Sequence, residues 1–131
     1  MEELTYEKFL EACDKIAYFV KDKNIKYVYG IPRGGLVLAT YLSYRLDIPL
    51  KQLVTNDKTL IVDDIVDTGK TLNYINAKIQ PIKCFTASIY YHRQSIIEPD
   101  LWLYEKKDKF IKFPWETEKT ARVDYENGRE Y

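Results

Sequence analysis

Three carboxylates follow one short apolar segment of the chain. Asp63 and Asp64 come directly after the strand-forming residues 59–62, and Asp67 follows three residues after Asp64. Adjacent carboxylates can accept hydrogen bonds from vicinal sugar hydroxyls or hold a divalent cation. The other reading is a strand that ends in a solvated acidic turn. Because a phosphate-type turn follows immediately, we favour a sugar-phosphate site.

That turn runs from Asp67 to Thr71 with the sequence Asp-Thr-Gly-Lys-Thr. It opens a predicted helix, and unpaired main-chain N–H groups at a helix N-terminus attract a phosphate. Gly69 allows close approach of the backbone, and the hydroxyls of Thr68 and Thr71 add donors. Together with Lys70, these residues are the predicted phosphate loop.

A second candidate site is the sequence Pro32-Arg33-Gly34-Gly35, which follows the predicted strand 27–31. A guanidinium and main-chain N–H groups can surround the same anion there. Taken alone, the motif fits equally well an ordinary strand-to-helix turn with a surface arginine.

The predicted elements alternate between strand and helix. A helix capped by Thr5 covers residues 6–22, and the pattern then predicts strands over 27–31, 49–54, 59–62 and 82–91, with helices over 36–46 and 70–80. This alternation predicts an α/β fold, a doubly wound and mainly parallel sheet with helices on both faces. Binding loops then meet at the carboxyl ends of the strands.

After His92 the pattern changes. Leu101–Tyr104 and Phe110–Phe113 are short strand-like segments on either side of a charged turn. We interpret residues 94–116 as a small C-terminal hood and residues 117–131 as a charged tail on one domain that spans residues 1–131. Taken by itself, this segment is a strand ended by proline, and its aromatic residues are expected to belong to the core.

Composition excludes several classes of protein. The chain has 131 residues with 20 basic and 20 acidic side chains, so no net charge favours general nucleic-acid binding. Neither a signal peptide nor a membrane span is visible, which predicts a cytoplasmic protein. Cys13 and Cys84 are predicted to be buried thiols, and the single histidine excludes a histidine-rich zinc site.

The segment from Thr59 to Leu72 closely resembles the phosphoribosyl pyrophosphate (PRPP) motif of the type I phosphoribosyltransferases. The resemblance implies that Asp63 and Asp64 contact the ribose hydroxyls and Mg²⁺. It implies that Asp67 lies beside the reacting base and C1 of the ribose and is the catalytic residue. It also implies that residues 67–71 bind the 5-phosphate, and that Arg33, Gly34 and Gly35 bind pyrophosphate. In that family the Arg33-type loop commonly contains a cis peptide.

The hood resembles that of microbial xanthine-guanine and hypoxanthine-guanine phosphoribosyltransferases. This likeness implies that Phe110 stacks on a purine and that Ile111 reads it through its main chain. Trp115 and Glu116 are then expected to support the turn after Pro114. With all three motifs in order, the resemblance covers residues 27–116.

Two features depart from the family pattern. His92 stands where relatives place a lysine that contacts the purine 6-oxygen, which makes it the predicted base contact and leaves the identity of the base open. The stretch between the Arg33 loop and the acids is also short, so the lid that usually covers PRPP is missing or reduced.

The implied function is transfer of 5-phosphoribosyl from PRPP to a purine base, with Mg²⁺ as cofactor and with PRPP and a purine base or nucleoside monophosphate as ligands. This is pentosyl transfer of the kind used in purine salvage. The resemblance leaves a homodimer open, and no membrane partner is expected. The alternative is a non-catalytic PRPP-sensing or nucleotide-sensing regulatory protein with the same fold.

Overall fold

The computed structural model of the protein describes residues 1–122. The end of the predicted tail, residues 123–131, lies outside them. Within the described residues, no helix combines the length and the apolar character that crossing a membrane requires.

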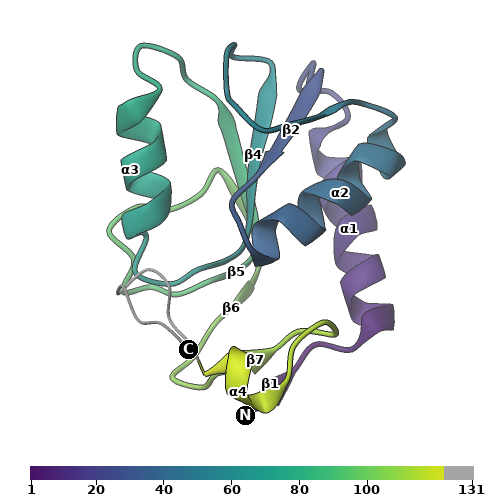
Figure 1. Cartoon of the computed structure of the whole chain (residues 1–131), viewed down its shortest axis with the longest axis vertical. Helices are drawn as coiled ribbons and strands as arrows, with labels where there is room; N and C mark the ends of the chain where they lie inside the picture. Colours follow the sequence, from purple (N-terminus) through teal and green to yellow (C-terminus); the bar gives the residue numbers. More distant parts are fainter. Residues whose placement is uncertain (123–131) are drawn as a thin grey trace.

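A five-stranded parallel sheet forms the centre of the molecule (Figure 1). Its strand order is β3-β2-β4-β5-β6, and every neighbouring pair is parallel. The strands are β2 (Tyr27–Gly30), β3 (Leu50–Lys51), β4 (Thr59–Val66), β5 (Phe85–Tyr91) and β6 (Leu101–Glu105). The register pairs Gly30 with Val62 and Asp63 with Ser88, which brings the predicted binding loops to one edge.

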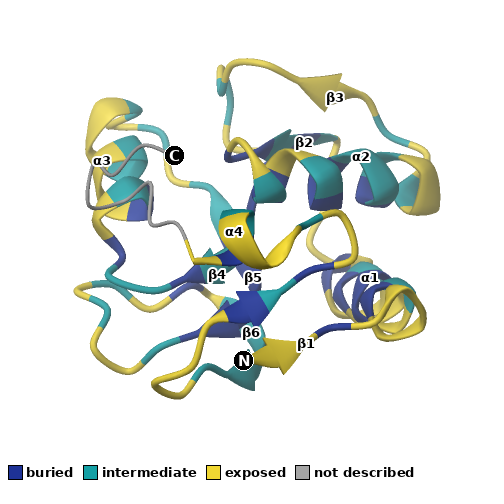
Figure 2. Ribbon diagram, turned by 60° about the horizontal axis from the view of Figure 1, so that its bottom comes forward, coloured by how far each residue is buried: buried dark blue, intermediate teal, exposed yellow. Residues whose placement is uncertain are grey.

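Helices cover both faces of the sheet, as the alternation of elements predicted. Helices α1 (Tyr6–Val20) and α2 (Gly34–Leu46) pack on one face, and α3 (Lys70–Lys78) packs on the other (Figure 1). Leu60 and Val62 of β4 belong to the core cluster on the α1–α2 side, whereas Ile61 between them packs with Leu72 of α3. This alternation is the period of two expected for a strand that is buried on both faces. Figure 2 shows the buried residues concentrated in the central strands and on the inner sides of α1 and α2.

The N-terminal helix forms as its sequence predicted. Thr5 caps α1, since its side-chain oxygen accepts from the main-chain N–H of Lys8 at 3.2 Å. The buried side of α1 includes Phe9, Ile16 and also Cys13, whose thiol was expected to be buried. Cys84 is only partly buried, and both thiols are free.

Helix α2 and strand β4 have bounds that differ from those predicted. The sequence pattern predicts a helix from Leu36, but α2 starts at Gly34. Leu36 is exposed, whereas Leu38, Ala39 and Leu42 are buried. Packing on β2 and β4, not the first residue of the helix, decides which residues of α2 face inward. Likewise β4 continues through the acids to Val66.

The segment Leu101–Glu105 was expected in the hood, and that expectation was wrong. It forms β6 and pairs in parallel with β5, from Ala87↔Leu101 to Tyr91↔Glu105. The adjacent edge of β5 offers its hydrogen-bonding groups to the segment, and an edge strand gains stability when its N–H and C=O groups are paired.

The hood is smaller than predicted and uses the N-terminus. Strand β7 (Ile111–Lys112) pairs in parallel with β1 (Glu2–Glu3), and the short helix α4 (Glu118–Ala121) follows. Figure 1 shows β1, β7 and α4 together at one end of the molecule, opposite the β3–β4 connection.

Candidate active site

A cavity of about 380 Å³ opens at the carboxyl ends of β2 and β4, beneath the hood. Its walls come from four parts of the chain: the loop after β2, the end of β4 with the start of α3, the turn after β6, and the hood. The lining residues are Ile31, Pro32, Arg33, Gly34, Asp63, Asp64, Ile65, Asp67, Thr71, Lys106, Phe110, Ile111, Phe113, Trp115, Glu116, Thr120 and Ala121. All three predicted motifs therefore contribute to one space.

The two adjacent acids lie within β4 and are largely shielded from water. The main-chain N–H of Asp64 donates to Asp63 Oδ1 at 2.9 Å, and that of Ile65 donates to Asp64 Oδ1 at 2.9 Å. Burial raises the pKa of the Asp64 carboxyl, and hydrogen bonds from Asp63 and the Ile65 N–H oppose this rise. A desolvated carboxylate of this kind gains from a cation or from hydroxyl donors on a ligand.

Helix α2 starts directly against these acids. A Cβ atom at position 34 would collide with the Asp64 carboxylate, and one at position 35 would come within 2.7 Å of the Val62 carbonyl oxygen. Glycine is therefore required at both positions by close approach rather than by turn geometry. The peptide between Pro32 and Arg33 is cis, as in the loop that the sequence resembles.

The predicted phosphate loop takes the form that its sequence indicated. Gly69 has a φ of 79° and precedes Lys70, the first residue of α3. The Thr68 side-chain oxygen accepts from the main-chain N–H of Lys70 at 3.3 Å. Of the loop residues, Asp67 and Thr71 line the cavity, whereas Thr68, Gly69 and Lys70 do not.

Asp67 is held by two side chains from the C-terminal half of the protein. Lys106 Nζ lies 3.2 Å from Asp67 Oδ2, and Gln94 Nε2 donates to Asp67 Oδ1 at 2.7 Å. Neither partner was predicted from the sequence. Lys106 lies among the charged residues 105–109, which read as a solvated turn, so no local signal distinguishes it from the lysines around it.

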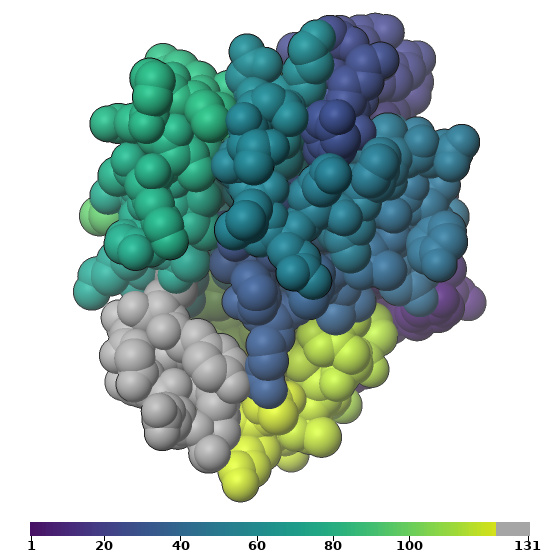
Figure 3. All heavy atoms as spheres, turned by 45° about the horizontal axis from the view of Figure 1, so that its top comes forward, coloured from purple at the N-terminus to yellow at the C-terminus, as the bar shows by residue number. Residues whose placement is uncertain are grey.

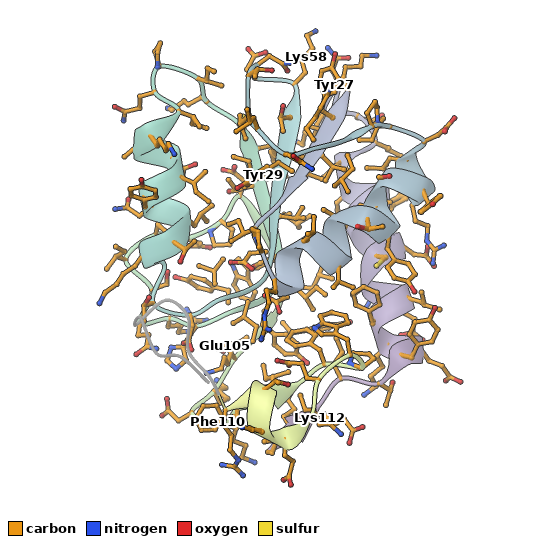
Figure 4. The ribbon with its side chains drawn as sticks, in the orientation of Figure 1. Tyr27, Tyr29, Lys58, Glu105, Phe110 and Lys112 are labelled. Carbon is orange, nitrogen blue, oxygen red and sulfur yellow. The ribbon has the colours of Figure 1, made fainter. Side chains whose placement is uncertain are left out.

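The hood presents two exposed aromatic side chains, Phe110 and Trp115, above a buried support. Phe110 is 42% exposed, whereas Ile111 and Phe113 are buried. Trp115 stacks on Phe113 with ring centroids 5.0 Å apart, and Glu116 Oε1 accepts from the Phe113 N–H at 3.0 Å. Trp115 and Glu116 thus hold the turn, as expected. Figure 4 shows Phe110 beside α4, with Glu105 of β6 nearby and Tyr27 at the opposite end of the sheet.

Glu116 also connects the hood to the acids of β4. Burial and the negative charge of Asp64 raise the pKa of the Glu116 carboxyl, whereas its bond from Phe113 and the nearby Arg33 lower it. Figure 3 shows the loop after β2, in dark blue, projecting against the yellow C-terminal segment. The Arg33 loop and the hood therefore both form walls of the same cavity.

His92 does not line this cavity, in contrast to its predicted role as a base contact. Its Nε2 lies 3.0 Å from Asp108 Oδ1, and its Nδ1 accepts from the main-chain N–H of Gln94 at 3.0 Å. Both ring nitrogens are thus used within the chain. Gly35, also a predicted site residue, does not line the cavity either, because it packs against β4.

The donor set fits Mg²⁺ only if a ligand contributes. Among residues 1–122, no group of three or more histidine, cysteine, aspartate or glutamate side chains is placed to hold a metal ion. Mg²⁺, however, is usually held by one or two carboxylates together with substrate phosphates and water. Asp63 and Asp64 match that arrangement.

Solved structures similar to this chain include purine phosphoribosyltransferases. A purine phosphoribosyltransferase from Pyrococcus horikoshii is 28% identical, with a TM-score of 0.80 over 88% of this chain and 93% of that one. A xanthine-guanine-hypoxanthine phosphoribosyltransferase from Helicobacter pylori is 23% identical, with a TM-score of 0.76 over 91% and 95%. A Neisseria gonorrhoeae protein with bound ppGpp is 17% identical, with a TM-score of 0.70 over 98% of each chain. No family model and no curated protein matches the sequence.

These comparisons confirm the resemblance to the type I phosphoribosyltransferases and the predicted α/β fold. The motifs in the sequence had indicated the same resemblance.

Proposed function

We propose that this chain, which has the type I phosphoribosyltransferase fold, transfers the 5-phosphoribosyl group from PRPP to a purine base and releases pyrophosphate. One observation carries the proposal. The acids of β4, the Arg33 loop and the hood aromatic Phe110 line a single cavity of about 380 Å³. The acids suit the hydroxyls of a sugar phosphate, the Arg33 loop suits a pyrophosphate, and the ring of Phe110 suits a flat base. We further propose that the protein acts in purine salvage in the cytoplasm.

In the proposed reaction, the bond between C1 of the ribose and the pyrophosphate oxygen breaks, and a bond from C1 to a ring nitrogen of the base forms. Positive charge develops on the ribose ring and negative charge on the leaving group. Arg33 and the N-terminus of α2 stabilise the pyrophosphate. Asp67 stabilises the positive ring or takes the proton that the base loses.

Asp63 and Asp64 would hold Mg²⁺ together with PRPP. When bound, the ion supplies positive charge to the pyrophosphate oxygens. The burial of Asp64 supports this role, because the carboxylate has lost water and gains from a cation or a hydroxyl donor.

The test is direct. The protein is incubated with PRPP, Mg²⁺ and each common purine in turn, and nucleoside monophosphate and pyrophosphate are measured. Product is expected with at least one base and is expected to fall strongly in Asp67→Asn. Absence of product with every base, from a protein that binds PRPP, would contradict transfer.

A second candidate function is nucleotide or PRPP sensing without transfer. It is favoured by the connection between β3 and β4, which consists only of residues 52–58 and contains no further helix or strand. A water-excluding lid usually protects such a reaction. Tight nucleotide binding without turnover would favour sensing, whereas slow PRPP hydrolysis without a base would favour an enzyme with an open site.

A further inference from the structure

We propose that Lys106 selects 6-oxopurines over 6-aminopurines in this cavity. The inference rests on the proposed function, because it names the class of base that the same site accepts. It goes beyond the sequence resemblance, which placed the base contact at His92 after β5. Here the cation comes from the turn after β6.

Lys106 faces the cavity and contacts Asp67, the proposed catalytic residue. Its side chain is only 12% exposed, and Nζ lies 3.2 Å from Asp67 Oδ2. Gln94 holds the other oxygen of the same carboxylate at 2.7 Å. A lysine is costly to bury unless its charge is paired, so the Asp67 pair explains how Lys106 is kept at the cavity wall.

The ends of β5 and β6 direct this side chain inward. The main-chain N–H of Lys106 donates to the Tyr91 carbonyl at 2.9 Å. The next lysine, Lys107, instead bonds Glu105 at 2.9 Å and is 71% exposed. Of these two adjacent lysines, the backbone therefore presents Lys106 to the cavity and Lys107 to solvent.

The chemistry of purine bases then gives the selectivity. N7 and the 6-substituent lie side by side on one edge of a purine. The 6-substituent is an acceptor oxygen in guanine and a donor amino group in adenine. With Asp67 placed against the N7 side of the base, a cation 3.2 Å from its carboxylate lies on the same edge as the 6-substituent. A lysine ammonium has three donors and no acceptor, and it therefore bonds a 6-oxygen but not a 6-amino group.

The experiment compares nucleotide affinities, which need no turnover. Dissociation constants for inosine, guanosine and adenosine 5′-monophosphates are measured by calorimetry with wild type, Lys106→Met and Lys107→Met. Wild type and Lys107→Met should prefer the 6-oxo nucleotides by about 10- to 100-fold, the factor for one charged hydrogen bond. In Lys106→Met the preference should fall to about threefold or less, mainly through weaker binding of the 6-oxo nucleotides.

Two further variants separate reading of the base from structural effects. Lys106→Gln keeps an N–H donor without the charge, so its preference should lie between those of wild type and Lys106→Met. Asp67→Asn removes the charge that pairs with Lys106, so it should weaken the 6-oxo preference as well as turnover. Thermal melting of each variant, together with unchanged PRPP affinity, checks that the fold is intact.

An unchanged preference in Lys106→Met, or a wild type that binds all three nucleotides equally or not at all, would overturn the role of Lys106. Failure of the proposed function looks different. A protein that binds 6-oxo nucleotides selectively through Lys106 but forms no nucleoside monophosphate would contradict transfer and support the inference.

Discussion

The main-chain N–H of Glu2 donates to the carbonyl oxygen of Phe110 at 2.9 Å, which joins the N-terminal strand to the residue proposed to stack on the base. Leu4 repeats the contact with Lys112 at 2.9 Å, and the Tyr90 hydroxyl donates to the Glu2 carboxylate at 3.0 Å. The hood is thus held by residues that are far from it in sequence.

This relationship predicts that Glu2→Pro weakens base binding, because proline has no N–H to donate to Phe110. The KM for the base should rise several-fold while PRPP affinity changes little. Glu2→Ala is the matched control, since it also removes the carboxylate but keeps the N–H. Equal KM values in the two variants would contradict a role for the β1–β7 pairing.

Asp64→Asn should weaken Mg²⁺-dependent PRPP binding and at the same time raise the melting temperature near pH 7. The first effect follows from loss of a carboxylate that would hold the ion with PRPP. The second follows because the variant removes a buried charge that lies near Glu116. Calorimetry with and without Mg²⁺ and thermal melting measure the two effects. PRPP affinity that responds equally to Mg²⁺ in both proteins would argue against the assignment.

Asp67→Asn should lower turnover by about 10²-fold or more, the range for a positioned acid–base group. PRPP binding should largely survive, because the main-chain groups of the phosphate loop remain. Steady-state kinetics and PRPP calorimetry together give the result. Turnover within about twofold of wild type would leave Asp67 only the structural role of anchoring Gln94 and Lys106.

Phe110→Leu should raise the KM for the base and leave the melting temperature unchanged. Stacking of an aromatic ring on a base contributes about 1 to 3 kcal/mol, and Phe110 is 42% exposed, so the core does not depend on it. Phe113→Leu is the control in the same segment, because Phe113 is buried and stacks with Trp115. That variant should lower the melting temperature. A lower melting temperature in Phe110→Leu with an unchanged KM for the base would show that Phe110 is a core residue and not a base contact.

His92→Gln separates the sequence-based prediction from the structure. If the Lys106 inference holds, the ratio of 6-oxo to 6-amino affinities in His92→Gln matches that of wild type at pH 6 and at pH 8. A ratio that varies with pH in wild type and becomes constant in His92→Gln would restore the histidine as the base contact.

Most of the candidate site could be predicted from the sequence because its chemistry is local. The acids at 63, 64 and 67 and the turn to Thr71 are contiguous, and so are Arg33 and Gly34. The end of a strand and the start of a helix are enough to give each group its shape. The resemblance to a family therefore pointed to the residues that the cavity brings together.

The hood was predicted less well because its limits depend on pairing between distant segments. Leu101–Glu105 has the composition of a short strand wherever it lies, and only the free edge of β5 decides that it joins the main sheet. The strand that pairs with Ile111–Lys112 could not be predicted from the sequence either, because glutamate is a poor strand former and Glu2–Glu3 has no strand pattern of its own.

By itself, the sequence determined the α/β alternation, the order of the motifs and the residues that carry charge at the sheet edge, because these follow from periodicity and short-range spacing. Only the tertiary structure decided that Lys106 faces Asp67 while His92 bonds Asp108. Each is a polar residue just beyond the end of a strand, and nothing in the neighbouring sequence says which side chain turns inward. That choice follows from the pairing of β6 with β5, in which the bond from the Lys106 N–H to the Tyr91 carbonyl fixes the direction of the backbone.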